Sequence, residues 1–174
     1  REWIYRQAFH MGRHIIGYEV EKVRAAVDWF SQSPNKDLKI GVAGFHEGGL
    51  IAFYAAAADK RIDAALVSGY FQSRQQVWDE PIYRNVWGLL AEFGDAEIAS
   101  LIAPRALIVE HSEIPAISEK IEKSEANIEL NGVPYSDYKG RFHTPQFISV
   151  KSEFDRIDKL LKPGFQQKHL ISGP

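Results

Sequence analysis

The sequence predicts one α/β domain, built on an open parallel sheet with helices on both faces. Three apolar runs have the length and β-branched content of buried strands: Leu38 to Ala43, Ala64 to Ser68 and Ala106 to Val109. Segments with helical spacing or Ala-rich composition separate these runs. Because a helix crosses from one strand to the next, the strands are expected to be parallel and adjacent in chain order.

The first element is expected to be an amphipathic helix that follows an aromatic-rich lead-in over residues 1–14. Its apolar positions recur at spacings of four and three, as on one face of a helix: Ile16, Val20, Val23, Val27 and Phe30. Pro34 and Asn35 then predict a turn before the first strand.

A strand, a glycine-rich turn and a helix are predicted between Leu38 and Asp59. The turn reads Gly44-Phe45-His46-Glu47-Gly48, which fits the spacing of the G-x-S-x-G nucleophile elbow. Small residues on either side of the centre let the backbone turn sharply and lift the central side chain above the sheet. The centre here is His46 rather than serine.

The second strand is expected within residues 64–71, and a mixed aromatic segment with a helix follows over residues 80–93. Asp95 is expected to cap a short helix over residues 96–101. The third strand is expected over residues 106–110, after a proline-containing turn. These elements complete the central part of the predicted sheet.

Residues 119–140 are charged and polar, and we expect part helix and part loop there. A second amphipathic helix is predicted from four apolar positions at spacings of four, three and four: Val150, Phe154, Ile157 and Leu161. Pro163-Gly164 should end it, and residues 169–171 could open a last strand. No repeat or linker divides the chain, so residues 1–174 are interpreted as a single partial domain.

Composition excludes several classes of protein. With 174 residues, of which 45% are hydrophobic, the chain can bury a core. A formal charge of −2 and the lack of a basic cluster argue against nucleic-acid binding. The absence of cysteine excludes disulfides and thiolate metal sites and leaves the compartment open. No apolar run approaches the roughly 20 residues of a membrane span, so no membrane association is expected.

Three stretches resemble the α/β-hydrolase superfamily, and within it the dienelactone hydrolase and acetyl-xylan-esterase-like branch. They read GRHIIGYEVEKVRAAVDWF, GVAGFHEGGLIAFYAAAADKRIDAALVSGYF and EPIYRNVWGLLAEFGDAEIASLIAPRALIVE, and together cover most of residues 12–110. The resemblance implies an elbow after the fifth strand of an eight-stranded sheet. The strands before it and the oxyanion-hole segment have no counterpart here, so the chain is interpreted as an incomplete hydrolase-like domain.

The resemblance also implies roles for individual residues. His46 stands at the nucleophile position, and the backbone N–H of Glu47 at one of two oxyanion donors, the second of which is missing. The triad acid would be Glu113, or alternatively Glu110. The triad histidine should follow the last strand, and His169 lies before or within that strand, so that role is not assigned.

Other interpretations of these residues stay open. His46 is a nucleophile or general base, or it marks an elbow that keeps the turn and has lost the chemistry. A metal site of His46, His111 and Glu113 is geometrically feasible, but the spacing does not demand one, and we expect neither metal nor cofactor. Glu47 suits the first turn of a helix on electrostatic grounds alone.

Two further features could be structural or functional. Glu80 and Arg84 have the spacing of an intrahelical ion pair. Five aromatic residues could line a ligand cleft or simply pack in the core: Tyr70, Phe71, Trp78, Tyr83 and Trp87.

Two hypotheses of function follow. The first is an esterase-like hydrolase that acts on a small ester or a carbohydrate ester through His46 and Glu113. The second is a non-catalytic hydrolase-fold module that keeps a binding or structural role. An incomplete sheet would expose one strand edge, so we expect the chain to associate with itself or with the missing portion of the domain.

Overall fold

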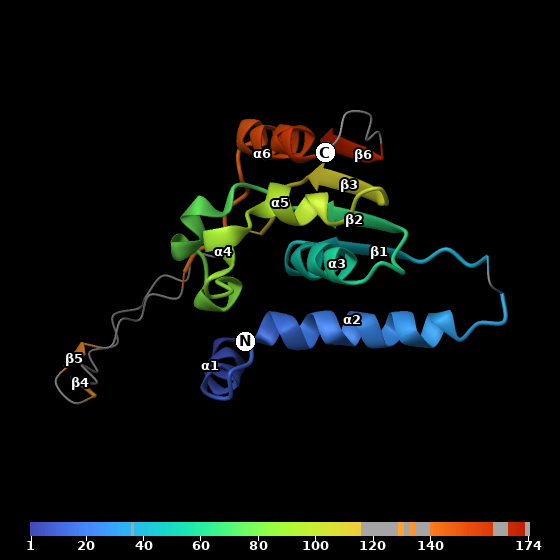
Figure 1. The fold of residues 1–174 in the computed structure, drawn as a ribbon. Helices are drawn as coiled ribbons and strands as arrows, with labels where there is room; N and C mark the ends of the chain where they lie inside the picture. The colour runs from blue at the N-terminus through green and yellow to red at the C-terminus, as the bar shows by residue number, and fades with distance from the viewer. Residues whose placement is uncertain (36, 116–128, 131–132, 135–139, 162–166, 173–174) are drawn as a thin grey trace.

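The computed structural model describes residues 1–35, 37–115, 129–130, 133–134, 140–161 and 167–172 (Figure 1). The helices are α1 (Glu2–His10), α2 (Ile15–Ser31), α3 (Glu47–Ala58), α4 (Leu89–Glu92), α5 (Asp95–Ser100) and α6 (Phe147–Leu160). Two 3-10 turns are η1 (Arg74–Asp79) and η2 (Ile82–Arg84). The strands are β1 (Gly41–Phe45), β2 (Ala64–Ser68), β3 (Ala106–His111), β4 (Glu129–Leu130), β5 (Val133–Pro134) and β6 (Lys168–Ser172).

The main sheet is parallel and open, with strand order β1-β2-β3-β6, which confirms the predicted fold class. The register places Gly41 opposite Ala64, and Ala64 opposite Ala106. The strands therefore end together, and the residues that follow them gather at one edge of the sheet. The last strand, expected at residues 169–171, is present as β6 beside β3.

The helices that connect these strands share one face of the sheet. Helices α3, α5 and α6 each link neighbouring strands in chain order, and right-handed crossovers then place all three on the same side. Helix α2 packs on α3 rather than on the sheet, and Figure 1 shows the two helices side by side. Helices were expected on both faces; coverage of the second face would need a reversal of strand order, which the four described strands do not contain.

The core lies between the sheet and this helical layer. Val67 and Val109 point toward it and are fully buried, whereas Phe45 and Ile171 are 47% and 44% exposed. Helix α3 is apolar on all sides because it contacts β1, β2, α2 and α5, and its Leu50 and Phe53 are fully buried. None of the described helices is long and apolar enough to span a bilayer.

Several predicted boundaries differ from the observed ones. Strand β1 begins three residues later than Leu38, because the N–H of Ile40 donates to the carboxylate of Asp63 (2.9 Å) and the ladder starts only at Gly41. Asp95 is not the N-cap of α5; Gly94 is, and the Asp95 side chain is fully buried. The helix expected within the segment 80–93 is the single turn α4, which η2 precedes.

The five aromatic residues do not form one cluster. Tyr70 and Phe71 are core residues at 2% exposure, Tyr83 is half-buried, and Trp78 and Trp87 are 71% and 87% exposed. Helix α6 confirms the second amphipathic prediction. Most of residues 119–140, and the stop signal at residues 163–164, lie outside the described residues.

Candidate functional site

His46 occupies a sharp turn between β1 and α3. Its backbone has φ 54° and ψ −112°, and it is the one non-glycine residue with positive φ in the described chain. Its N–H donates to the carbonyl of Ser68 (2.9 Å), and its carbonyl accepts from the N–H of Leu50 (3.1 Å). A non-glycine residue in such a region is strained by roughly 1–3 kcal/mol, which the surrounding contacts must offset. The predicted elbow is therefore present in the backbone.

The glycines of the turn have different roles. A Cβ on Gly44 would lie 2.0 Å from the carbonyl oxygen of Gly48, and a Cβ on Gly49 would lie 2.7 Å from that of Ser68. A Cβ on Gly48 would meet nothing within 4 Å. The close approach of backbone to backbone thus requires glycine at positions 44 and 49, and Gly48 is not required by space.

The imidazole of His46 lies under the ring of Phe142. The two rings meet edge to face with centroids 4.6 Å apart, and the Nε2 atom is buried with no hydrogen-bond partner among the described residues. Burial lowers the pKa of His46, and the positive charge of Arg84 lowers it further, against the opposing effect of Glu47 and Glu80. The imidazole is therefore neutral at pH 7, with one ring nitrogen unused.

A buried ionic network supports the turn. Glu47, the first residue of α3, accepts from Nε of Arg84, and Arg84 Nη1 lies 3.4 Å from Glu80. Arg74 makes two hydrogen bonds to Glu80, at 2.8 and 2.6 Å. Arg84 is 4% exposed, and its Cζ lies 4.3 Å from the centroid of Phe142. Its Nη2 has no hydrogen-bond partner in the part of the chain that the structure describes. The predicted Glu80–Arg84 contact is thus part of a network that fixes Glu47.

This network leaves two unpartnered nitrogens against one aromatic ring: Nε2 of His46 and Nη2 of Arg84 both belong to groups that contact Phe142. Buried nitrogens without protein partners are rare, so a pair of them at one turn is a candidate for a functional role. The first N–H groups of α3, beginning with Glu47, also lack intrahelical acceptors. Proton donors and one base therefore converge at the start of α3.

No hydrogen bond among the described residues joins the other predicted site residues to this cluster. Glu113 is exposed, and no described carboxylate bonds to Nε2 of His46. His111 Nε2 lies 2.9 Å from the carbonyl of Pro145. His169 lies within β6 and is exposed. In the part of the chain that the structure describes, no three potential ligands gather into a metal site.

Asp95 is a buried group that the sequence did not reveal. Its carboxylate accepts from the Tyr70 hydroxyl (3.3 Å) and from the N–H of Gln72 (3.2 Å). Complete burial raises the pKa of Asp95 to about 7, and Glu153 and Glu80 act in the same direction against Arg74. A carboxyl group that titrates near neutral pH therefore lies next to the network.

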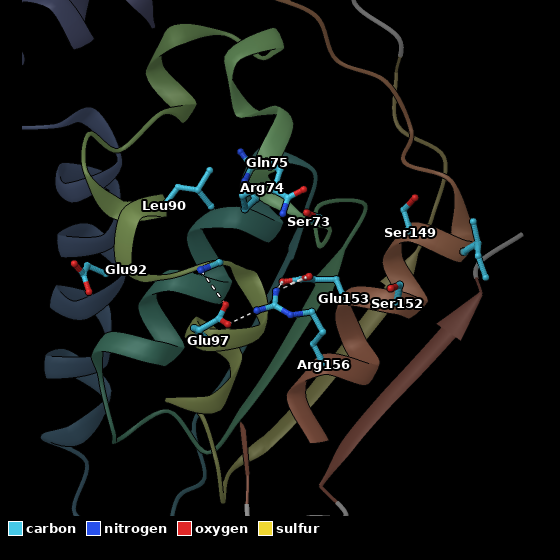
Figure 2. A pocket seen from close by; sticks show the side chains of 12 residues that line it. Ser73, Arg74, Gln75, Leu90, Glu92, Glu97, Ser149, Ser152, Glu153 and Arg156 are labelled. Carbon is cyan, nitrogen blue, oxygen red and sulfur yellow. Dashed lines mark hydrogen bonds and ion pairs between the residues drawn. The ribbon is translucent and has the colours of Figure 1, made fainter. Parts of the chain in front are cut away.

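A separate cleft of about 790 Å³ lies between η1, α4, α5 and α6 (Figure 2). Arg156 forms its floor, with Nη1 2.8 Å from Glu153 and Nη2 on Glu97. Arg74 also borders the cleft, so its guanidinium lies between this space and the elbow network. His46 is not among the lining residues.

Most of the chain matches a known protein family. A model of the dienelactone hydrolase family matches residues 5–136, which include the elbow and the first three strands of the sheet. The chain belongs to this family. The predicted resemblance is thereby confirmed, and the chain is an α/β-hydrolase-fold protein of the dienelactone hydrolase family.

Two solved structures are similar to this dienelactone hydrolase family member. One is a promiscuous CE15 esterase from the marine bacterial metagenome, with a TM-score of 0.49 at 14% identity, covering 89% of this chain and 42% of that one. The other is the glucuronoyl esterase from Solibacter usitatus, with a TM-score of 0.43 at 15% identity, covering 88% and 43%. The chain thus spans less than half the length of either protein. No curated protein matches its sequence.

Proposed function

We propose that this family member hydrolyses a small ester, with His46 as a general base that activates water. The observation that carries the proposal is a neutral imidazole with an unpartnered Nε2, held at a strained elbow above the start of α3. A base must be unprotonated at working pH, and the lowered pKa of His46 meets that condition. Membership in a hydrolase family supports the same reaction class.

The reaction follows from the groups around the elbow. Water attacks the ester carbonyl carbon while its proton passes to Nε2 of His46, and the carbonyl oxygen gains a negative charge. The N–H of Glu47 and Nη2 of Arg84 are the donors proposed for that oxyanion. Collapse of the intermediate breaks the bond to the alcohol oxygen, which takes the proton back from the imidazolium. No acyl-enzyme forms, because the elbow carries no hydroxyl group.

Phe142 has to move for this reaction. Its ring packs against the imidazole of His46 and the guanidinium of Arg84, so an ester is expected to reach both groups by taking the place of the ring. The ring is 8% exposed and borders the surface. A compact, flat ester is therefore the expected substrate class.

Turnover of p-nitrophenyl acetate by the full chain tests the proposal. His46→Ala should lower kcat/KM about 100-fold or more, the usual contribution of a general base. Phe142→Ala should raise kcat/KM, because it uncovers the imidazole. Tyr18→Ala, at an exposed position on α2, is the control and should not change the rate. Equal rates for wild type and His46→Ala would contradict the proposal.

A second function is favoured by one observation. His46 Nε2 is closed against Phe142, and no carboxylate hydrogen-bonds the imidazole among the described residues, as expected of a module without catalysis. In that case wild type and Phe142→Ala both lack turnover, and His46→Ser restores it by supplying a hydroxyl at the elbow. Turnover by wild type that His46→Ala abolishes would exclude this second function.

A further inference from the structure

We propose that the cleft between η1, α4, α5 and α6 binds a neutral sugar, at a site separate from the elbow. Its volume of about 790 Å³ lies within the range of roughly 300–1,000 Å³ that is typical of ligand sites. None of its lining residues belongs to the turn at His46, and the proposed hydrolysis does not use it. Three aspects of its lining indicate the ligand class.

The first aspect is that the charges on the floor are joined in ion pairs, with two carboxylates to one guanidinium. Arg156 bonds both oxygens of Glu153 at 2.8 Å and also binds Glu97. Glu97 accepts from the N–H of Gly94 (3.0 Å), and Glu153 accepts from that of Ala96 (2.9 Å). Both carboxylates are thus fixed in place and share the one counter-charge of Arg156, so the floor offers oriented acceptors and its remaining negative charge disfavours an anionic ligand.

The second aspect is a set of uncharged polar side chains on the walls. Four of these side chains make no hydrogen bond to a described residue: Ser73, Gln75, Ser149 and Ser152. Figure 2 shows Gln75 on η1 with Ser73 just before it, and Ser149 and Ser152 on α6. Hydroxyl and amide groups both donate and accept hydrogen bonds, so they can pair with the hydroxyl groups of a sugar, which also donate and accept.

The third aspect is apolar surface at the edge of the cleft. Leu90 on α4 is 40% exposed, and Ile148 on α6 is 67% exposed. A pyranose ring presents C–H faces between its hydroxyl groups, and those faces gain from contact with such side chains. A phosphate or a simple inorganic ion would leave this surface unused. Neutral polar groups, paired charges and aliphatic edges together favour an uncharged sugar.

Amide NMR of the full chain titrated with xylobiose tests this inference. We expect shifts of the amide signals of Gln75, Ser149 and Ser152, with a Kd in the millimolar range that is common for sugars in open clefts. Ser152→Trp should weaken binding at least tenfold by filling the cleft. Lys159→Trp adds the same ring at an exposed position of α6 outside the cleft, and should bind as wild type does.

Two further variants test the cleft independently of Ser152→Trp and of the elbow. Gln75→Ala changes an exposed side chain, so it should weaken binding several-fold even if Ser152→Trp fails to fold. His46→Ala should bind xylobiose normally, which separates this inference from the proposed hydrolysis. Shifts confined to the elbow, tighter binding of glucuronate than of xylobiose, or no shifts up to about 50 mM sugar (a Kd that corresponds to only about −2 kcal/mol) would overturn it.

Discussion

Asp95 should make the stability of this protein depend on pH in a way that one substitution removes. Its carboxyl group is fully buried, and burial raises its pKa from 3.8 to about 7. The groups that face it are the hydroxyls of Tyr70 and Tyr54, the N–H of Gln72, and the charges of Arg74, Glu80 and Glu153. Below pH 7 the folded protein keeps a proton on Asp95 that the unfolded chain releases above pH 3.8. The free energy of unfolding should therefore fall as pH rises through this window.

The expected size follows from the shift of about three pKa units, each equivalent to about 1.4 kcal/mol. Relative to low pH, where Asp95 is protonated in both states, the free energy of unfolding is then lower by about 4 kcal/mol above pH 8. At pH 5 it is lower by less than about 2 kcal/mol. Between pH 5 and pH 8 this one group should remove about 3 kcal/mol. Asp95→Asn keeps a neutral acceptor of similar shape for the N–H of Gln72, and should abolish this part of the pH dependence.

Urea unfolding of wild type and Asp95→Asn at pH 5 and pH 8 measures the effect directly. The difference in unfolding free energy between the two proteins should change by about 3 kcal/mol across this range, in favour of the variant at pH 8. Asp155→Asn is the control, since this exposed aspartate pairs with Lys151 on the surface of α6. A difference that is the same at both pH values would refute the reasoning.

Two more predictions concern the elbow. Gly44→Ala should lower the free energy of unfolding by about 3 kcal/mol or more, because its methyl group would lie 2.0 Å from a carbonyl oxygen. Gly48→Ala should raise the free energy of unfolding by up to about 1 kcal/mol, because its methyl group would meet nothing within 4 Å. Equal urea midpoints for the two variants would contradict this prediction. Glu113→Gln should leave the pKa of His46 unchanged in an NMR titration, and Glu47→Gln should lower that pKa by removing a carboxylate that favours imidazolium. A lowered pKa in Glu113→Gln would instead support the predicted triad-like contact.

Helices and strands that depend on the local spacing of apolar residues could be predicted from the sequence. Helices α2 and α6 were predicted from apolar spacing, and β2 and β3 from buried runs between helices. The start of β1 could not be predicted, because it depends on a hydrogen bond from Ile40 to the side chain of Asp63. In the segment 80–93 the expected helix is limited to the single turn α4, and the residues before it follow a path set by tertiary ion pairs of Arg84, one of them with Glu47.

At the site, too, features that depend on local sequence could be predicted and features that depend on tertiary contacts could not. The turn at His46 is a local feature, so the spacing of its glycines was sufficient to predict it. The ring of Phe142 contacts the imidazole, and the guanidinium of Arg84 contacts that ring. Both residues come from distant parts of the chain, and no short sequence motif predicts them. Asp95 is a residue type common at helix N-caps, which is why the sequence predicted a cap there. Its raised pKa depends on tertiary burial, which the sequence does not reveal.

The pH dependence of kcat/KM for p-nitrophenyl acetate tests the central claim most directly. If His46 is the base, kcat/KM should rise through a pKa below 6.5, since burial and Arg84 lower the pKa of its imidazole, and should be constant above it. That pKa should equal the one observed for the His46 ring by NMR in the same protein. A rate that rises in proportion to hydroxide without a plateau, or a plateau that persists in His46→Gln, would contradict the account.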